Sequence, residues 1–215
     1  MGQLPLWVDL TDSPVLVVGA GRAAAVKIPP LLSAGARVRV VAPAASEAVR
    51  ALAFGGRLTW ESRPFSAGDV AGMRLVVAAV GDLAVHRAVW DAARQAGAWV
   101  IDAAWPEQGQ ATFGAVVRRD PLVLGIATGG VAPRVAARIR AELEAAYGPE
   151  WSAYCRLMGE VRAWARAKLP PERRRRAWER LEALPLLEWI RRGERSRATE
   201  AAWAVLKEEV DGHER

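Results

Sequence analysis

A glycine-rich turn near the start of the chain has the spacing of a phosphate-binding loop. Gly19-Ala20-Gly21-Arg22-Ala23-Ala24 fits the pattern Gly-x-Gly-x-x-Ala and directly follows the apolar run 15–18. In such a turn the first glycine permits the tight bend, the second lets the backbone approach a pyrophosphate, and the alanine allows a helix to pack closely on a strand. The turn therefore predicts a dinucleotide site, and the alternative is a tight strand-to-helix turn without a ligand.

The segment that follows the second apolar run carries no acidic side chain. That run, residues 37–42, leads into Pro43 and Ala44. Dinucleotide-binding domains place an acid here to bind the ribose hydroxyls of the adenosine. We expect Pro43 and Ala44 to line the adenine through backbone and apolar contacts only. These residues therefore do not distinguish NAD from NADP.

His86 is a candidate acid or base, because an imidazole exchanges protons near neutral pH and can also ligate a metal ion. It is one of two histidines in the chain, and no second histidine lies beside it. We therefore expect no dedicated metal site.

The composition and charge pattern exclude several classes of protein. The single Cys155 cannot form an internal disulfide, and no apolar run approaches the length of a membrane span. The first residues lack the features of a secretory signal, so a cytoplasmic protein without membrane association is expected. The net charge is +6, and almost all of the excess lies after residue 112. This half of the chain should attract anions.

The densest basic run, residues 173–176, consists of four consecutive arginines. We interpret it as a solvated, partly paired helix face, since no nucleic-acid-binding motif accompanies it and no nucleic-acid partner is expected. The alternative is a nucleotide-sensing or nucleic-acid-binding module, which rests only on the charge and on this run.

Short β-rich runs alternate with helical segments up to about residue 112. This pattern predicts a parallel sheet covered on both faces, that is, an α/β fold with a Rossmann-type domain over residues 1–112. Prolines 29 and 30 should kink or split the first helix. The predicted strands are residues 15–19, 37–42, 57–62, 74–80 and 99–104.

The pattern changes after residue 112. Residues 113–147 read as two strands joined by a tight turn and followed by a helix, which we take as a small α+β dimerisation segment. It is too small and too apolar to form its own core, which favours a homodimer. Residues 148–215 read as an all-helical domain, with helices that break near Pro170, Pro185 and Gly193. Its tryptophans are expected to anchor the core; they are Trp151, Trp164, Trp178, Trp189 and Trp203.

Three segments, residues 4–43, 127–144 and 173–182, together resemble the precorrin-2 dehydrogenase and sirohydrochlorin ferrochelatase family, the N-terminal module of sirohaem synthases. The run Thr-Gly-Gly-x-x-Pro-x-x-x-Ala-Arg-x-Arg, residues 128–140 of the second segment, is the most specific feature. The resemblance implies homodimers that oxidise precorrin-2 to sirohydrochlorin with NAD, many of which also insert ferrous iron. It also implies a Rossmann domain, a dimerisation segment and a C-terminal helical domain.

The resemblance implies a tetrapyrrole-binding site in the second segment, at Thr128, Gly129, Gly130, Arg134 and Arg138. The two arginines lie one turn apart near a helix N-terminus, which suits the carboxylates of a tetrapyrrole. The alternatives are ordinary surface arginines and, for Thr128, a cap of the following helix.

In the family, the segment after the fourth strand contains two aspartates and an asparagine. This sequence keeps one of the acids, Asp82, which we expect on the cofactor side, and has His86 in place of the asparagine. The family's pattern near the fifth strand is Asn-Val-Val-Asp, and we align its aspartate, the general base, with Ala104. Asp102 would lie on the same strand face about 6–7 Å away. Asp102 is therefore a candidate base, and the alternative is a helix cap or a partner of an arginine.

Three functions follow from these patterns. The first is NAD-dependent oxidation of precorrin-2, with ferrochelatase activity as an additional step. The second is a tetrapyrrole-binding carrier or chelatase-like protein of the same fold that has lost the redox step. The third is the nucleotide-sensing or nucleic-acid-binding module.

Overall fold

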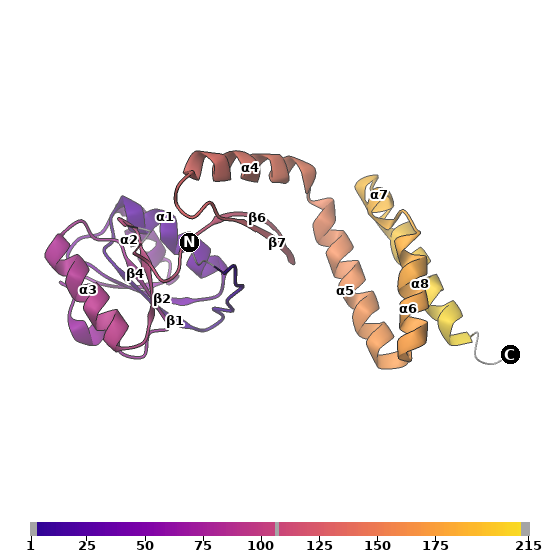
Figure 1. The fold of residues 1–215 in the computed structure, drawn as a ribbon, viewed down its shortest axis with the longest axis horizontal. Helices are drawn as coiled ribbons and strands as arrows, with labels where there is room; N and C mark the ends of the chain where they lie inside the picture. The colour runs from indigo at the N-terminus through magenta and orange to yellow at the C-terminus, as the bar shows by residue number, and fades with distance from the viewer. Residues whose placement is uncertain (1–3, 106–107, 212–215) are drawn as a thin grey trace. The chain divides into compact units, whose positions relative to one another are not determined.

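The computed structural model describes residues 4–105 and 108–211. The chain divides into two compact units (Figure 1). The first comprises Met1–Phe113 together with Gly129–Val131, and the second comprises Gly114–Thr128 together with Ala132–Arg215.

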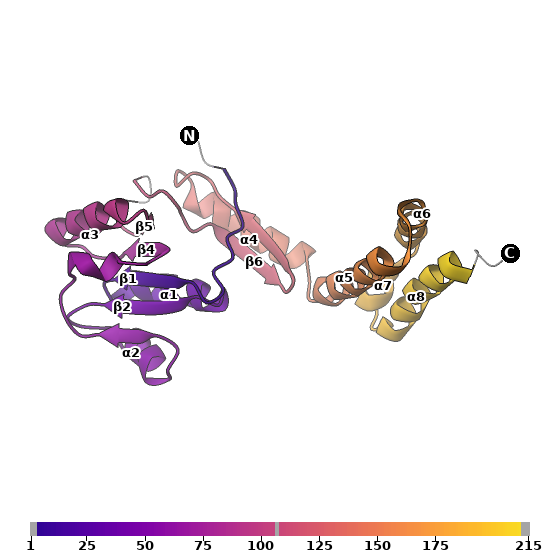
Figure 2. The same cartoon turned by 90° about the horizontal axis from the view of Figure 1, so that it is seen from below.

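The first unit is built on a five-stranded parallel sheet in the order β3-β2-β1-β4-β5 (Figure 2). Its central strands β1 and β4 are apolar on both faces, as expected for a parallel sheet buried between helices. The predicted Rossmann-type α/β fold is confirmed. The strands are β1 (Pro14–Val18), β2 (Arg37–Val41), β3 (Thr59–Glu61), β4 (Leu75–Ala78) and β5 (Trp99–Asp102).

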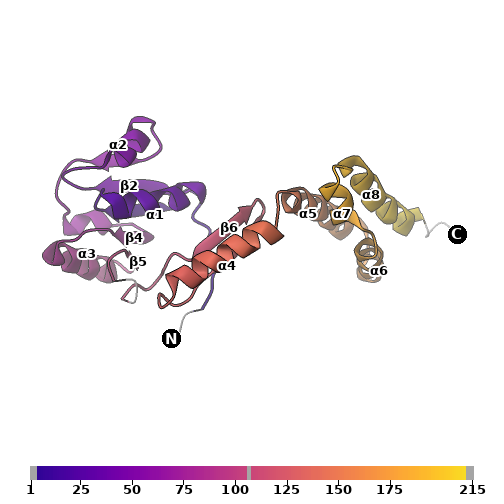
Figure 3. The same ribbon diagram turned by 90° about the horizontal axis from the view of Figure 1, so that it is seen from above.

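The two faces of the sheet pack against different helices (Figure 3). Val15 and Val17 join the core under α1 (Arg22–Ser33) and α2 (Glu47–Phe54). Leu16 and Val18 join the core under α3 (Leu83–Gln95) and the short 3-10 helix η1 (Ala67–Val70). This period of two is the pattern of a strand with both faces buried.

The prolines do not split the first helix, so this part of the prediction is wrong. Helix α1 continues through Pro29 and Pro30 and ends at Ser33. The two prolines are exposed, while Ala24, Ile28 and Leu31 on the opposite side are completely or almost completely buried. A proline has no amide N–H to donate, and each one in a helix interior costs about 3 kcal/mol. Burial of the apolar side of α1 offsets this cost.

The second unit begins with the antiparallel hairpin β6 (Ala115–Arg119) and β7 (Leu122–Ile126), whose two-residue turn contains a cis Asp120–Pro121 bond. Helix α4 (Pro133–Ala146) lies on the hairpin. Four more helices follow, and the first three of them end near the predicted prolines and glycine. They are α5 (Glu150–Lys168), α6 (Pro171–Glu182), α7 (Leu186–Arg191) and α8 (Arg195–Asp211).

The helices α5 to α8 share a hydrophobic core to which four of the five predicted tryptophans contribute. Trp151 departs from the prediction, because it packs between Tyr147 and Tyr154, with ring centroids 5.0 and 5.9 Å away. Among the described residues, no helix is both long and apolar enough to cross a bilayer.

Candidate functional site

The glycine turn lies where β1 ends and α1 begins, and its two glycines have different structural roles. Gly19 has φ +97°, and a Cβ atom there would collide with the carbonyl oxygen of Ala79. A Cβ atom on Gly21 would meet nothing within 4 Å. Gly19 therefore makes the bend, and Gly21 faces open space into which a ligand can approach the backbone.

The first turn of α1 offers unpaired backbone donors beside that open space. The first helical hydrogen bond is donated by the Ala25 N–H to the carbonyl of Gly21, and no side chain caps the helix in the described part of the chain. The N–H groups of residues 22–24 precede this bond and are free to bind an anion at the positive end of the helix dipole. Buried Ala24 lets α1 approach the sheet closely. A pyrophosphate fits these groups.

Pro43 and Ala44 are exposed in the loop after β2. The Ser62 hydroxyl donates to the carbonyl of Pro43, and the Ser46 N–H donates to the carbonyl of Ala20. The second bond connects this loop to the glycine turn.

Asp82 lies in the loop after β4, at the same edge of the sheet as the glycine turn. Its carboxylate accepts hydrogen bonds from the N–H groups of Ala84 and Val85, at 2.8 and 3.1 Å. Asp82 is thus the N-cap of α3. Its expected contact with a cofactor stays a prediction.

A buried hydrogen-bond network surrounds Asp102, the last residue of β5. The carboxylate oxygen Oδ2 contacts His86 Nε2 at 2.5 Å and accepts from Trp90 Nε1 at 2.9 Å. Oδ1 accepts from the N–H groups of Ala104 and Trp105, both at 2.8 Å. Asp102 is only 2% exposed and His86 only 5%. The carboxylate is therefore saturated by four donors and shielded from any large ligand.

The protonation of this network follows from its environment. Burial raises the pKa of the Asp102 carboxyl, but its hydrogen bonds, first among them the one from the Trp105 N–H, lower it more. The net pKa lies below the usual 3.8, so the carboxylate is ionised at neutral pH and can only accept. His86 therefore carries its hydrogen on Nε2 when neutral.

The predicted relation between Asp102 and Ala104 is wrong. The strand predicted over 99–104 ends at Asp102, so Ala104 lies in the following turn and strand alternation does not apply to it. The strand itself, Trp99-Val100-Ile101-Asp102, carries an acid at its end as Asn-Val-Val-Asp does. Asp102 caps the turn that follows β5 rather than a helix, and its side-chain partners are His86 and Trp90 rather than an arginine, so neither alternative holds in the structure.

His86 also lines a cavity of about 440 Å³ between α3 and the chain that follows β5. The α3 residues in its wall recur at intervals of three and four, which places them on one helix face. Trp90 was not predicted, although its position four residues after His86 was a usable signal. The lining residues are Leu83, His86, Arg87, Trp90, Asp91, Arg94, Trp105 and Gln108.

The predicted tetrapyrrole-binding residues lie around the start of α4. Gly129 and Gly130 have φ +62° and +81°. The N-cap of α4 is Ala132, so Thr128 does not cap this helix. Arg134 is exposed in the first turn, and Arg138 is exposed and pairs with Glu142 at 2.9 Å. The two arginines point from one helix face, as predicted. In the described part of the chain, no cluster of three His, Cys, Asp or Glu side chains could hold a metal ion.

Comparison with known proteins gives relatives for the whole chain. The family model NAD_binding_7, described as "Putative NAD(P)-binding", matches residues 6–115. The "Siroheme synthase" of Methylococcus capsulatus is 35% identical over 212 residues, which is 98% of this chain and 44% of that protein. The "Siroheme synthase 1" of Pectobacterium atrosepticum is 37% identical over 84% of this chain and 38% of its own length. The chain thus spans less than half of the length of these curated relatives.

A solved structure named "SirC, precorrin-2 dehydrogenase" superposes with a TM-score of 0.75, covering 95% of this chain and 100% of that chain at 24% identity. This similarity shows the fold. The resemblance seen in the sequence is confirmed by the family model and by the relatives. The chain therefore belongs to the NAD_binding_7 family of NAD(P)-binding domains and is a relative of the sirohaem synthases.

Proposed function

We propose that this protein oxidises precorrin-2 to sirohydrochlorin, a step of sirohaem biosynthesis, with NAD as the cofactor. The observation that carries the proposal is that similarity to a sirohaem synthase runs over 98% of the chain, well beyond the nucleotide-binding family match at residues 6–115. A bound nicotinamide supplies a hydride acceptor. The reaction also releases a proton, which the protein has to accept.

The glycine turn would hold the cofactor's pyrophosphate on the free N–H groups of α1. His86 would accept the proton, because its imidazole lines a cavity whereas the Asp102 carboxylate is saturated and buried. Asp102 would then act as a positioning residue: it fixes the imidazole through Nε2 and stabilises the imidazolium that forms. Trp90 and two backbone N–H groups hold Asp102 in place.

Arg134 and Arg138 would bind carboxylates of the tetrapyrrole. The pair between Arg138 and Glu142 is largely exposed and contributes little, so a substrate carboxylate can replace Glu142 at small cost. The hydroxyl of Thr128 remains available to a ligand because it does not cap α4. The cytoplasmic location stays a prediction.

An anaerobic assay with precorrin-2 tests the proposed function. With NAD present, we expect NADH to form together with the absorption spectrum of sirohydrochlorin, and a parallel assay with NADP ranks the two cofactors. Adding ferrous iron to the product then tests for sirohaem formation. Binding of the tetrapyrrole without NADH formation would refute the dehydrogenase. It would support the second candidate, a tetrapyrrole-binding carrier or chelatase-like protein, which the inaccessibility of Asp102 favours.

We also expect a homodimer. Strand β7 has no buried residue, and α4 buries only Ala136 of its fourteen residues. Val135 of α4 is 50% exposed. A second copy would cover these apolar side chains, since exposed apolar surface of this kind is typical of an interface. Light scattering at micromolar concentration should give twice the chain mass of 23.2 kDa. A stable monomer would contradict the expectation.

A further inference from the structure

The four-arginine run of the sequence lies beside a groove within the second unit. The groove has a volume of about 680 Å³ and is formed by α5 and α6. Its α6 residues recur at intervals of three and four over the length of the helix, so they form one continuous face. The lining residues are Arg162, Ala165, Arg166, Pro171, Arg174, Arg175, Trp178, Glu179 and Glu182.

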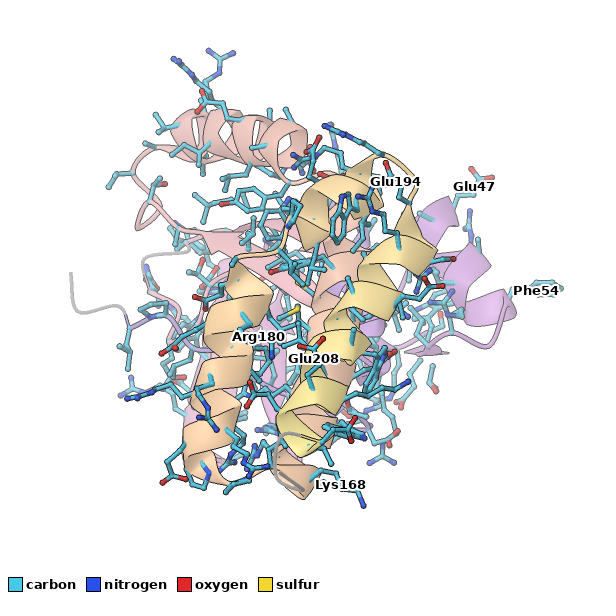
Figure 4. All side chains as sticks on the ribbon, turned by 90° about the vertical axis from the view of Figure 1, so that its right-hand side faces the viewer. Glu47, Phe54, Lys168, Arg180, Glu194 and Glu208 are labelled. Carbon is cyan, nitrogen blue, oxygen red and sulfur yellow. The ribbon has the colours of Figure 1, made fainter. Side chains whose placement is uncertain are left out.

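The arginines of α6 divide between two faces of the helix. Arg173 donates to the carbonyl of Glu209 at 2.8 Å, and Arg176 pairs with the Glu209 carboxylate at 3.5 Å. Arg180, on the same face, pairs with Glu208, and Figure 4 shows the two side chains meeting between α6 and α8. This face is neutralised by α8, as the interpretation of a partly paired helix face predicts.

The other face is only partly neutralised, because four arginines but only two glutamates line the groove. No carboxylate of the described residues lies within 4.0 Å of the guanidinium nitrogens of Arg162, Arg166 or Arg174. Arg175 has only Glu179, at 3.6 Å, and both side chains of that pair are largely exposed. The cations gather at the end of the groove where α6 begins and α5 ends. The positive end of the α6 dipole adds to their field.

Trp178 gives this groove a flat apolar surface. Its indole is half-buried, packs on the core of the second unit and lines the groove beside the arginines. An aromatic face next to guanidinium groups suits a ligand that is itself flat and carries anionic groups on its edge.

We propose that the α5–α6 groove binds a polycarboxylate tetrapyrrole at a second site, separate from the nucleotide-binding unit. The proposal rests on the proposed function for the identity of the ligand class. The guanidinium groups come from two helices and are spread over more than one helical turn, so a single phosphate would engage only some of them. Several carboxylates on one large ring can engage them separately, each through charge-assisted hydrogen bonds.

The test is a calorimetric titration of the full chain with uroporphyrin, a stable octacarboxylic porphyrin, in the presence of saturating NAD. We expect two binding events per chain for the wild type. Arg166→Gln with Arg174→Gln should weaken one event about tenfold or more and leave the other unchanged. Arg162→Gln with Arg166→Gln, which changes only exposed side chains, serves as a second variant.

The matched control is Arg192→Gln with Arg195→Gln, which removes the same charge from exposed positions outside the groove. It should retain both events. Porphyrin binding that the groove variants retain to the same extent as the control, whether as one event or two, would overturn the proposal. Groove-dependent binding of a short DNA oligonucleotide in place of the porphyrin would overturn it too. If the precorrin-2 assay fails but the groove variants still lose one porphyrin-binding event selectively, the proposed function is refuted and the groove site is not.

Discussion

Asp102→Asn should lower the turnover of precorrin-2 by about a hundredfold to ten-thousandfold, the usual contribution of positioned acid–base catalysis. Four donors converge on the Asp102 carboxylate, and an asparagine offers one acceptor oxygen and one donor group in its place. It cannot stabilise an imidazolium at His86. Steady-state NADH formation should show the loss in kcat, with a smaller change in KM.

The controls for this variant come from the same network. His86→Asn should lose a similar factor, and the double variant should lose little more, because residues that act as a unit are not additive. Ala104→Asp should not raise the rate, since Ala104 lies in a turn and contributes only its N–H. Thermal unfolding measures the loss of stability separately from the loss of activity. We expect a loss of about 1–3 kcal/mol, because the substitution leaves a buried donor unpaired. Turnover in Asp102→Asn equal to that of the wild type would exclude the His86–Asp102 pair from the reaction.

Gly21→Asp should weaken NAD binding by about a hundredfold or more. Gly21 has φ −81° and open space around its Cβ position, so the chain can adopt its native conformation with an aspartate there. The new carboxylate would then occupy the space that a pyrophosphate needs and would repel it. Calorimetry with NAD on the folded variant measures the loss.

Two neighbouring variants show whether charge or backbone is responsible. Gly21→Ala adds a methyl group without charge and should weaken binding much less. Gly19→Ala should instead destabilise the fold, because φ +97° and the carbonyl of Ala79 both oppose a Cβ atom. Unchanged NAD affinity in folded Gly21→Asp would mean that the turn is purely structural.

The sheet could be predicted because local sequence determines it. Strands such as Leu75–Ala78 are buried on both faces, so each is a continuous apolar run whose identity does not depend on its neighbours. The course of α1 could not be predicted in the same way. Local propensity argues against a helix through Pro29 and Pro30, and only the tertiary burial of Ile28 and Leu31 reverses that preference.

The glycine turn was visible in the sequence because its residues are contiguous. The network at Asp102 was not, because its members come from α3, β5 and the following turn. His86 and Asp102 are 16 residues apart, and only the packing of α3 beside β5 brings them to 2.5 Å. The predicted strand runs two residues past the end of β5, and this was enough to place Ala104 on the strand. The ends of elements depend on competing hydrogen bonds, here those of Ala104 and Trp105 to Asp102.

Gly129–Val131 belong to the first unit, and this limits where the chain can be divided. The chain leaves the first unit after Phe113, returns for three residues and leaves again. A protease that cuts once between Phe113 and Gly114 would therefore not produce two independent fragments, since the C-terminal fragment still supplies part of the first unit. The same holds for gene fusions and domain exchanges: a junction at this point would separate the nucleotide-binding unit from three of its own residues.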